Sequence, residues 1–577
     1  MPDLLAAPDT TMCQGTFFVL ENKYIIGGIR KMNQLNNDLP ELKEENHPAE
    51  GNPSENKTNL PLLNKVRQNY GVFGGLSLLF GGVFAFCFYE AGIGLNMFLF
   101  VFLTVLVILV AMKQLSIPIK NLTWAYLIGA ILLGLSSMLT ANGAILFLNT
   151  VGMLILLELA LLHQLFDDKQ WDFYQHFSYM FLTVISSIAS LNLPLKDFFE
   201  YLKKTRLFQH DKIRSVFIGI VIAVPLLWMI IGLLSSADLL FSELTDSIYT
   251  FIFSSDIIWI LLMIIIGYAA CYLLLCGFTA RAGLTEKSGQ VKKADSSIAI
   301  TVLSLLCFVY LIFCGIQIFY LFAHGLFVLP KEFTFAEYAR RGFFELLWVT
   351  VINIILMIIS TTWFQESKVT RFLLTCITVS TYVMIGSAVY RMLLYIGAYN
   401  LTFLRLIVLL FLAIDSFVLA GVILTVYKKG FPLFQYCIAV TSVFYLIFSF
   451  GKPDYLIASY YVRQNQEMKI GDVLYLTEDL SLDAVSVVLP YLEQITTYQE
   501  TTIDNMNERN DQDRYNQESY SKDSKDITDD WFDTIKADYY ERIHMAYRKC
   551  DTGYEFRNFN LSTYLAEKET LGINNRK

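Results

Sequence analysis

Long apolar runs constrain this chain more than any other feature. From Gly71 to Phe450, stretches of hydrophobic residues follow one another with short polar connections between them. About 20 such residues form a helix long enough to cross the roughly 30 Å hydrocarbon core of a bilayer. Hydrophobic residues make up 55% of the chain and charged residues only 17%, which is too apolar for a water-soluble globule of this size. The sequence therefore predicts an all-α fold, a polytopic helix bundle embedded in lipid.

We predict about eleven spanning helices in this region. Their expected ranges are 71–90, 93–112, 122–140, 142–166, 215–234, 257–278, 297–322, 343–363, 372–396, 402–427 and 432–450. Between the fourth and fifth of them, residues 171–191 mix aromatic and aliphatic side chains and precede a basic run, which is typical of a helix lying in the membrane interface. Residues 235–256 are a second candidate for such an element.

Polar segments flank the membrane region on both sides. Residues 1–70, rich in Asn, Glu, Lys and Pro, predict a disordered polar arm. The tail from 451 to 577 contains 24 acidic and 15 basic residues, and its amphipathic stretches predict a small, mainly helical domain. Within this tail, 498–530 lack apolar periodicity and indicate a flexible insertion.

Basic residues mark every second connection between the expected helices. Lys113 and Lys120 follow the second span, Lys368 and Arg371 precede the ninth, and Lys428 follows the tenth. Lys and Arg are enriched in cytoplasmic loops of membrane proteins. With an odd number of spans, we expect a multi-pass protein of the cell (inner) membrane with a cytoplasmic N-terminus and an extracytoplasmic C-terminal domain.

Polar side chains interrupt the apolar pattern around the eighth, ninth and tenth spans. Glu337, Arg341 and Glu345 fall at four-residue steps, so in a helix they share one face. Asp415 lies ten residues after Arg405, about 15 Å deeper in the membrane at 1.5 Å per residue. The residues expected to line a polar cavity facing the exterior are Glu337, Tyr338, Arg340, Arg341, Glu345, Asn353, Arg391, Tyr395, Arg405 and Asp415.

Two interpretations of these residues remain open. Intramembrane charges are costly and commonly face a partner or a water-filled cavity, which favours a ligand or ion site. In the structural interpretation, Glu337, Arg340 and Arg341 form ion pairs at the membrane interface. Arg391 and Arg405 extend their charged ends outward to the interface, and Asp415 caps a buried neighbour.

Several functional classes lack their sequence signatures. The chain contains no phosphate-binding Gly-rich loop, no metalloprotease His-Glu pair and no serine nucleophile elbow. Its six histidines have no metal-ligand spacing, and it is not basic enough to suggest nucleic acid. We therefore predict no catalytic residues, metal, cofactor or nucleic-acid partner, and an enzymatic role is not favoured.

Three segments of the chain resemble a known family. They are Glu337-Tyr-Ala-Arg-Arg-Gly-Phe-Phe-Glu-Leu346, Tyr399-Asn-Leu-Thr-Phe-Leu-Arg405 and Leu480-Ser-Leu-Asp-Ala484. Together they are similar to the bacterial polytopic membrane family called domain of unknown function 4173, related to 4153. In the second segment this chain has Asn400 where the family pattern has Gly. The resemblance implies a bacterial cell-envelope location and no assigned activity.

These observations support three hypotheses about function. A transporter or channel for a small solute or ion would use the exterior-facing cavity, and this hypothesis is slightly favoured. An envelope sensor or scaffold would bind a protein partner through the exterior tail. A membrane enzyme acting on a lipid-linked substrate would place Glu337, Glu345 or Asp415 over a head group. In all three the lipid bilayer is the surrounding partner.

Overall fold

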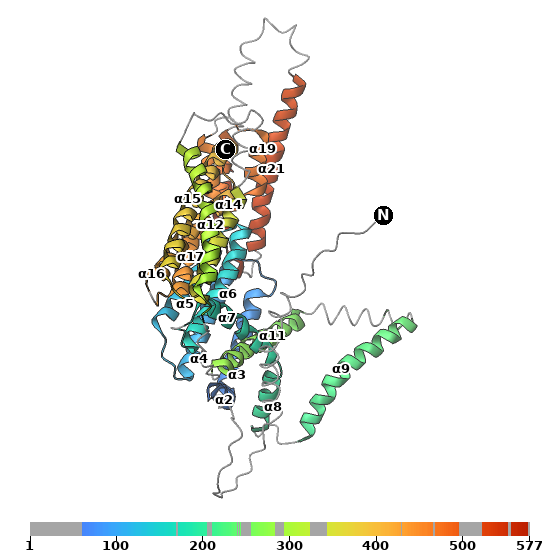
Figure 1. Ribbon diagram of the computed structural model, residues 1–577. Coiled ribbons are helices and arrows are strands. Elements are labelled where there is room, and N and C mark those ends of the chain that lie inside the picture. The colour runs from blue at the N-terminus through green and yellow to red at the C-terminus, as the bar shows by residue number, and fades with distance from the viewer. Residues whose placement is uncertain are drawn as a thin grey trace, which may run out of the picture. The chain divides into compact units, whose positions relative to one another are not determined.

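A computed structural model describes residues 61–574, except 169–170, 205–210, 239–240, 242, 244–255, 283–292, 323–342, 429, 465–467, 495–521 and 552–555. In the described part of the chain, the regular structure is helical apart from one isolated parallel bridge between Ala294 and Phe364. This confirms the predicted all-α class (Figure 1). The helices are α2 (Pro61–Gln68), α3 (Tyr70–Phe88), α4 (Leu95–Gln114), α5 (Asn121–Leu139), α6 (Gly143–Leu165), α7 (Phe173–Ala189), α8 (Leu193–Lys204), α9 (Asp211–Ala237), α11 (Asp256–Ala282), α12 (Ser296–Phe322), α14 (Phe343–Trp363), α15 (Lys368–Tyr399), α16 (Phe403–Tyr427), α17 (Leu433–Phe450), α18 (Pro453–Gln464), α19 (Ile470–Leu474), η2 (Tyr475–Asp479), η3 (Leu482–Ala484), α21 (Lys522–Asp551), η4 (Phe556–Asn558) and α22 (Leu561–Asn574).

Ten of the described helices are long and apolar enough to cross a membrane. They are α3, α4, α5, α6, α11, α12, α14, α15, α16 and α17. The count reaches eleven if α7 and the first part of α8, bent by 48° relative to each other, form one broken span. The predicted multi-helix membrane architecture is confirmed.

The segments on either side of 205–210 are helical, and their predicted relation to the membrane stays open. The expected interfacial helix 171–191 is α7, and together with Leu193–Leu202 it passes the length and hydropathy test for a span. The expected span 215–234 lies within α9, of which Pro225–Ala237 counts as a shorter apolar helix. Pro225 lies inside α9 and cannot donate an intrahelical hydrogen bond. Side chains 211–218 of α9 lie outside the described residues, so the span 215–234 stays a prediction.

Helices also extend into both segments that were predicted to be irregular. α2 occupies the end of the expected arm 1–70, since Pro61 suits the first position of a helix and Leu63 and Val66 are buried. α21 begins at Lys522, inside the expected insertion 498–530. Residues 1–60 and 495–521 lie outside the described part of the chain.

The chain divides into two compact units. The first contains residues 61–75, 181–233 and 269–285 among those described. Its polar centre is Asp197, which accepts hydrogen bonds from Arg67 at 2.8–3.1 Å and from the Tyr272 hydroxyl at 2.8 Å. Close packing occurs at Gly277, where an added Cβ would lie 2.7 Å from the Cα of Ser187.

The second unit contains most of the spanning helices and the whole described tail. Its bundle has two apolar clusters. One joins α4, α5 and α6, and the other joins α12, α14, α15, α16 and the start of α17. Phe434 of α17 belongs to the first cluster and its neighbour Leu433 to the second, so α17 connects the two.

The tail has an apolar core of its own. Helices α18, α19, α21 and α22 meet around Ile457, Val488, Leu489 and Ile543, each with no exposed surface, and Figure 1 shows α19 and α21 at one end of the bundle. We call this the capped end, because the tail contacts the connections α3–α4, α5–α6 and α15–α16 there.

Candidate functional site

The predicted cavity residues lie on α14, α15 and α16, apart from the four that precede α14. Glu337, Tyr338, Arg340 and Arg341 lie outside the described residues. Glu345 is exposed in the first turn of α14. The three helices pack against one another, and α12, which the prediction did not include, packs against α15.

Asn353 forms a polar connection across three of these helices. It has no exposed surface. Its Oδ1 accepts a hydrogen bond from the Tyr310 hydroxyl of α12 at 2.7 Å, and its Nδ2 donates to Thr381 Oγ1 of α15 at 3.0 Å. An amide with matched partners in an apolar bundle holds helices together.

Arg391 forms the second polar connection, between α15 and α12. Its side chain is buried, and the guanidinium donates to Gln317 Oε1 at 3.3 Å. The same oxygen accepts from the Ser387 hydroxyl at 2.8 Å. These hydrogen bonds link α15 to α12 at a buried position.

Asp415 on α16 differs from these two residues. It is 5% exposed, and Thr350 of α14 is its side-chain hydrogen-bond neighbour. Its Oδ2 has no hydrogen-bond partner among the described residues. A buried carboxylate oxygen left without a donor is costly, so this position is a candidate for a proton or a bound cation.

Arg405 and Tyr395 cap the end of α15. Arg405 donates to the backbone oxygens of Tyr399 and Asn400, and its guanidinium lies 4.2 Å from the centre of the Tyr395 ring. The backbone at Asn400 has φ +64° and ψ 177°, a conformation that is essentially restricted to Gly. The Asn-for-Gly difference from the family pattern is therefore at a position whose backbone favours Gly and strains Asn.

The structure thus places Asn353, Arg391 and Asp415 in one bundle of α12, α14, α15 and α16. Tyr395 packs against the apolar cluster of this bundle and contacts Arg405 at the end of α15. An open cavity among these helices stays a prediction.

A second polar cluster, at the capped end, was not predicted as a site. Asp483 is buried; its Oδ2 accepts from the Thr140 hydroxyl and its Oδ1 from the Ala141 backbone N–H at 3.0 Å. Asn560 donates to the Thr140 carbonyl at 2.7 Å. These bonds hold the tail on the α5–α6 connection. One sequence signal existed, because Asp483 lies in the segment 480–484 that carried the family resemblance.

The opposite end of the second unit contains a further group that the sequence analysis missed. Asp168 Oδ2 lies 2.8 Å from His163 Nδ1 and 3.7 Å from His176 Nε2. Burial alone would raise the pKa of Asp168, but hydrogen bonds and charge interactions with the two histidines outweigh it and hold the pKa well below its usual value. His176 also stacks on Phe434 of α17, with ring centroids 4.2 Å apart. The group therefore joins the end of α6 to α7 and α17.

The long apolar helices and the polar contacts buried among them define the class of this molecule, a multi-pass membrane protein. A family model described as "Domain of unknown function (DUF4153)" matches residues 127–491, which is more than half of the chain. The chain therefore belongs to this family, one of the two named by the resemblance. No curated protein and no solved structure matches it.

Proposed function

We propose that the protein is a transporter of a small solute or ion and that Asp415 is the residue that binds the proton or cation. One observation carries the proposal: Asp415 is 5% exposed, lies within the bundle, and has a carboxylate oxygen without a partner among the described residues. A charge at the centre of a membrane helix costs about 2.5 kcal/mol or more. A proton or cation bound at Asp415 offsets this cost.

Two groups of polar contacts in the same bundle as Asp415 support this proposal. Tyr310, Asn353 and Thr381 form a continuous hydrogen-bonded row across α12, α14 and α15, and Arg391 with Gln317 forms another. Interhelical hydrogen bonds of this kind also serve as structural connections. Asp415 distinguishes the two roles, because a purely structural polar residue has its hydrogen-bonding groups satisfied.

The test uses the purified full-length chain in liposomes that enclose a pH-sensitive dye. We expect a Na⁺ or K⁺ gradient, or a pH step, to produce flux above that of empty liposomes, and Asp415→Asn to abolish it at unchanged expression. Asp295→Asn, at an exposed carboxylate before α12, is the matched control and should keep full flux. Equal flux in Asp415→Asn and the wild type would reject the proposal.

We also propose that the capped end faces the outside of the cell. The connections that meet the tail, such as Gly92–Gly94 and Ala141, lack basic residues. The opposite ends of the same helices carry Lys113 and Lys368, which supports a cytoplasmic location for those ends. Impermeant maleimide applied to intact cells should label Ala537→Cys in the tail and leave Gln114→Cys unlabelled; the reverse result would invert the topology.

A second candidate function, a sensor or scaffold that binds a protein through the tail, is supported by exposed apolar side chains there. Met545 on α21 and Leu571 on α22 are more than half exposed. A photo-crosslinker placed at position 545 in living cells should yield one defined adduct, whereas the same crosslinker at 537 should not. Equal patterns at the two positions would remove this candidate.

A further inference from the structure

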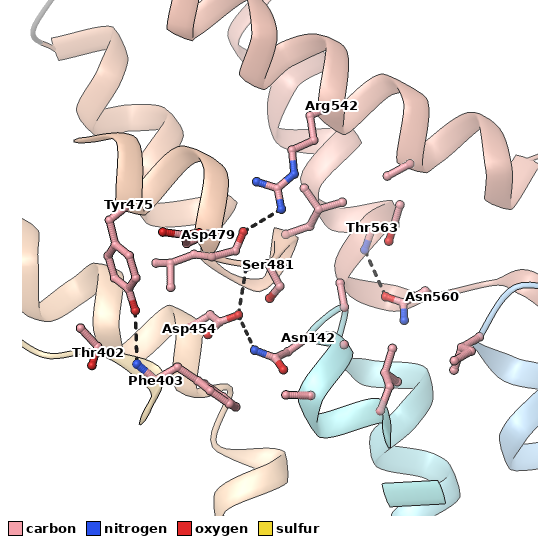
Figure 2. Close-up of a pocket in the computed structure, with 18 of the residues that line it drawn as sticks. Asn142, Thr402, Phe403, Asp454, Tyr475, Asp479, Ser481, Arg542, Asn560 and Thr563 are labelled. Atoms are coloured by element: carbon pink, nitrogen blue, oxygen red, sulfur yellow. Dashed lines mark hydrogen bonds between the residues drawn. The ribbon is translucent and has the colours of Figure 1, made fainter. Parts of the chain in front are cut away.

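A pocket of about 760 Å³ lies under the tail at the capped end, within the 300–1,000 Å³ range of small-molecule sites. Its walls come from the α5–α6 connection, the start of α16, the first turn of α18, the segment 479–482, α21 and the start of α22. Figure 2 shows Asp454 between Asn142 and Ser481, with Tyr475 and Arg542 on other walls. The pocket is separate from Asp415, which does not line it.

Asp454 has an unmet need for a hydrogen-bond donor. It is 1% exposed, and its Oδ2 accepts from Asn142 Nδ2 at 2.8 Å and from the Ser481 backbone N–H at 3.0 Å. Its Oδ1 is buried and has no partner among the described residues. A buried anion without a donor is unfavourable. A donor bound in the pocket, which Asp454 lines, would complete the site once the carboxylate turns Oδ1 toward it.

The charges of the lining favour a cation. Asp454 and Asp479 are acidic, and Arg542 is the one basic side chain among the lining residues. Arg542 donates to the backbone oxygens of Thr477, Glu478 and Leu480, so it is engaged in holding that segment. An ammonium group would meet the Asp454 carboxylate in a charge-assisted hydrogen bond.

The remaining polar groups suit hydroxyls. The Tyr475 hydroxyl accepts from the Phe403 N–H at 3.2 Å, and burial raises the pKa of the Tyr475 phenol, so this hydroxyl keeps its own proton to donate. The Ser481 hydroxyl accepts from the Asp483 N–H at 3.3 Å and likewise has a proton left. The hydroxyl-bearing residues Thr402 and Thr563 also line the pocket.

An inorganic cation fits this pocket less well. Calcium takes 6–8 oxygen ligands, and the described residues contain no group of three or more His, Cys, Asp or Glu side chains placed to hold a metal. The volume also exceeds that of a single ion. We propose that the pocket binds a small hydroxylated organic amine, with its ammonium group on Asp454 Oδ1 and its hydroxyls on Tyr475 and Ser481.

The test measures binding by the purified full-length protein in nanodiscs, with ethanolamine, serinol and glucosamine as probes. Each is compared with its N-acetyl derivative, which keeps the hydroxyls and loses the charge. At least one amine should raise the unfolding temperature saturably and give a measurable Kd by calorimetry, and its acetylated form should not. Absence of saturable binding by all three amines, equal binding of the acetylated forms, or equal stabilisation by Na⁺ or Ca²⁺ would overturn the proposal.

Two variants locate the bound amine. Asp454→Asn removes the charge with little change of shape and should raise Kd by roughly 100-fold, as for a buried charged hydrogen bond that loses one partner. Ala144→Phe places a ring at the exposed start of α6, where Ala144 lines the pocket, and should abolish binding without touching the hydrogen bonds. Ala537→Phe, exposed on α21 and outside the pocket, is its matched control and should bind normally.

If Asp454→Asn fails to fold, Ala144→Phe alone shows whether the amine binds in this pocket. Binding by this variant as tight as that of the control would place the amine elsewhere and reject the proposal.

Discussion

Replacing Asp483 with Ala should release the tail from the α5–α6 connection. The substitution removes the acceptor of the Thr140 hydroxyl and of the Ala141 N–H. Hydrogen bonds to a charged group contribute about 1.5–3 kcal/mol each. Because the two share one carboxylate and are not fully additive, we expect a local loss of ~3–5 kcal/mol. At about 1.4 kcal/mol per factor of ten, the open population should rise by roughly 10²- to 4 × 10³-fold.

Hydrogen exchange of the Ala141 amide measures this opening directly, because that N–H is bonded to Asp483 Oδ1 at 3.0 Å. We expect the peptide covering 139–146 to exchange faster in Asp483→Ala by the same factor, since exchange reports local opening. Asp538→Ala, at an exposed carboxylate on α21, should leave the rate unchanged. If exchange in 139–146 is the same in both variants, the Asp483 contacts do not hold the tail, and the reasoning from buried hydrogen bonds fails.

Three further substitutions test other parts of the molecule. Asn400→Gly should raise the unfolding temperature, because φ +64° with ψ 177° is a strained backbone for a residue with a Cβ, costing about 1–3 kcal/mol; a lower temperature would refute the strain. Gly277→Ala should destabilise the folded protein by about 1–3 kcal/mol, because the added Cβ clashes with Ser187. Gly232→Ala is the control, since an added Cβ there has nothing within 4 Å, and it should leave the stability unchanged. Equal shifts of the unfolding temperature in the two variants would count against close packing at Gly277. Because its folded pKa lies below the usual 3.8, Asp168 adds stability above pH 3.8 that is lost as pH falls below that value. The difference in unfolding temperature between the wild type and Asp168→Asn should therefore shrink as pH falls below 3.8, and a difference that grows there would reverse the sign.

The spanning helices could be predicted from the sequence because hydropathy is a local property. A run such as 402–427 carries its own evidence, and it appears as α16, Phe403–Tyr427. For 171–191 the hydropathy pattern predicted an interfacial helix and not a span. The reason is that α7 is only 17 residues long and reaches spanning length only together with the following α8. A window that scores one straight helix at a time does not register a bent pair.

The candidate site could be predicted in part for a related reason. An ionisable residue inside an apolar run, such as Asp415, can be recognised in the sequence, because a charge within the membrane is energetically costly and is rarely present without a role. Its neighbour Thr350, on another helix, cannot be recognised in this way, because threonine is common in membrane helices. The Thr140–Asp483 bond joins residues 343 positions apart, and no local pattern pairs them. The contacts of Arg405 with the backbone oxygens of Tyr399 and Asn400 could not be predicted from the sequence, because they depend on the backbone turn at Asn400; its place in a cavity stays a prediction.

Helix α16 links the two proposed sites. Its first residue, Phe403, lines the pocket under the tail, and Asp415 follows twelve positions later, about 18 Å along the axis at 1.5 Å per residue. A packed helix moves as a unit, so a ligand that favours one position of its first turn also biases the surroundings of Asp415. Such coupling is reciprocal: occupation of Asp415 must change the affinity of the pocket by the same factor that the ligand changes the affinity of Asp415. An amine Kd that is identical in the wild type and Asp415→Asn would show instead that the two sites act independently.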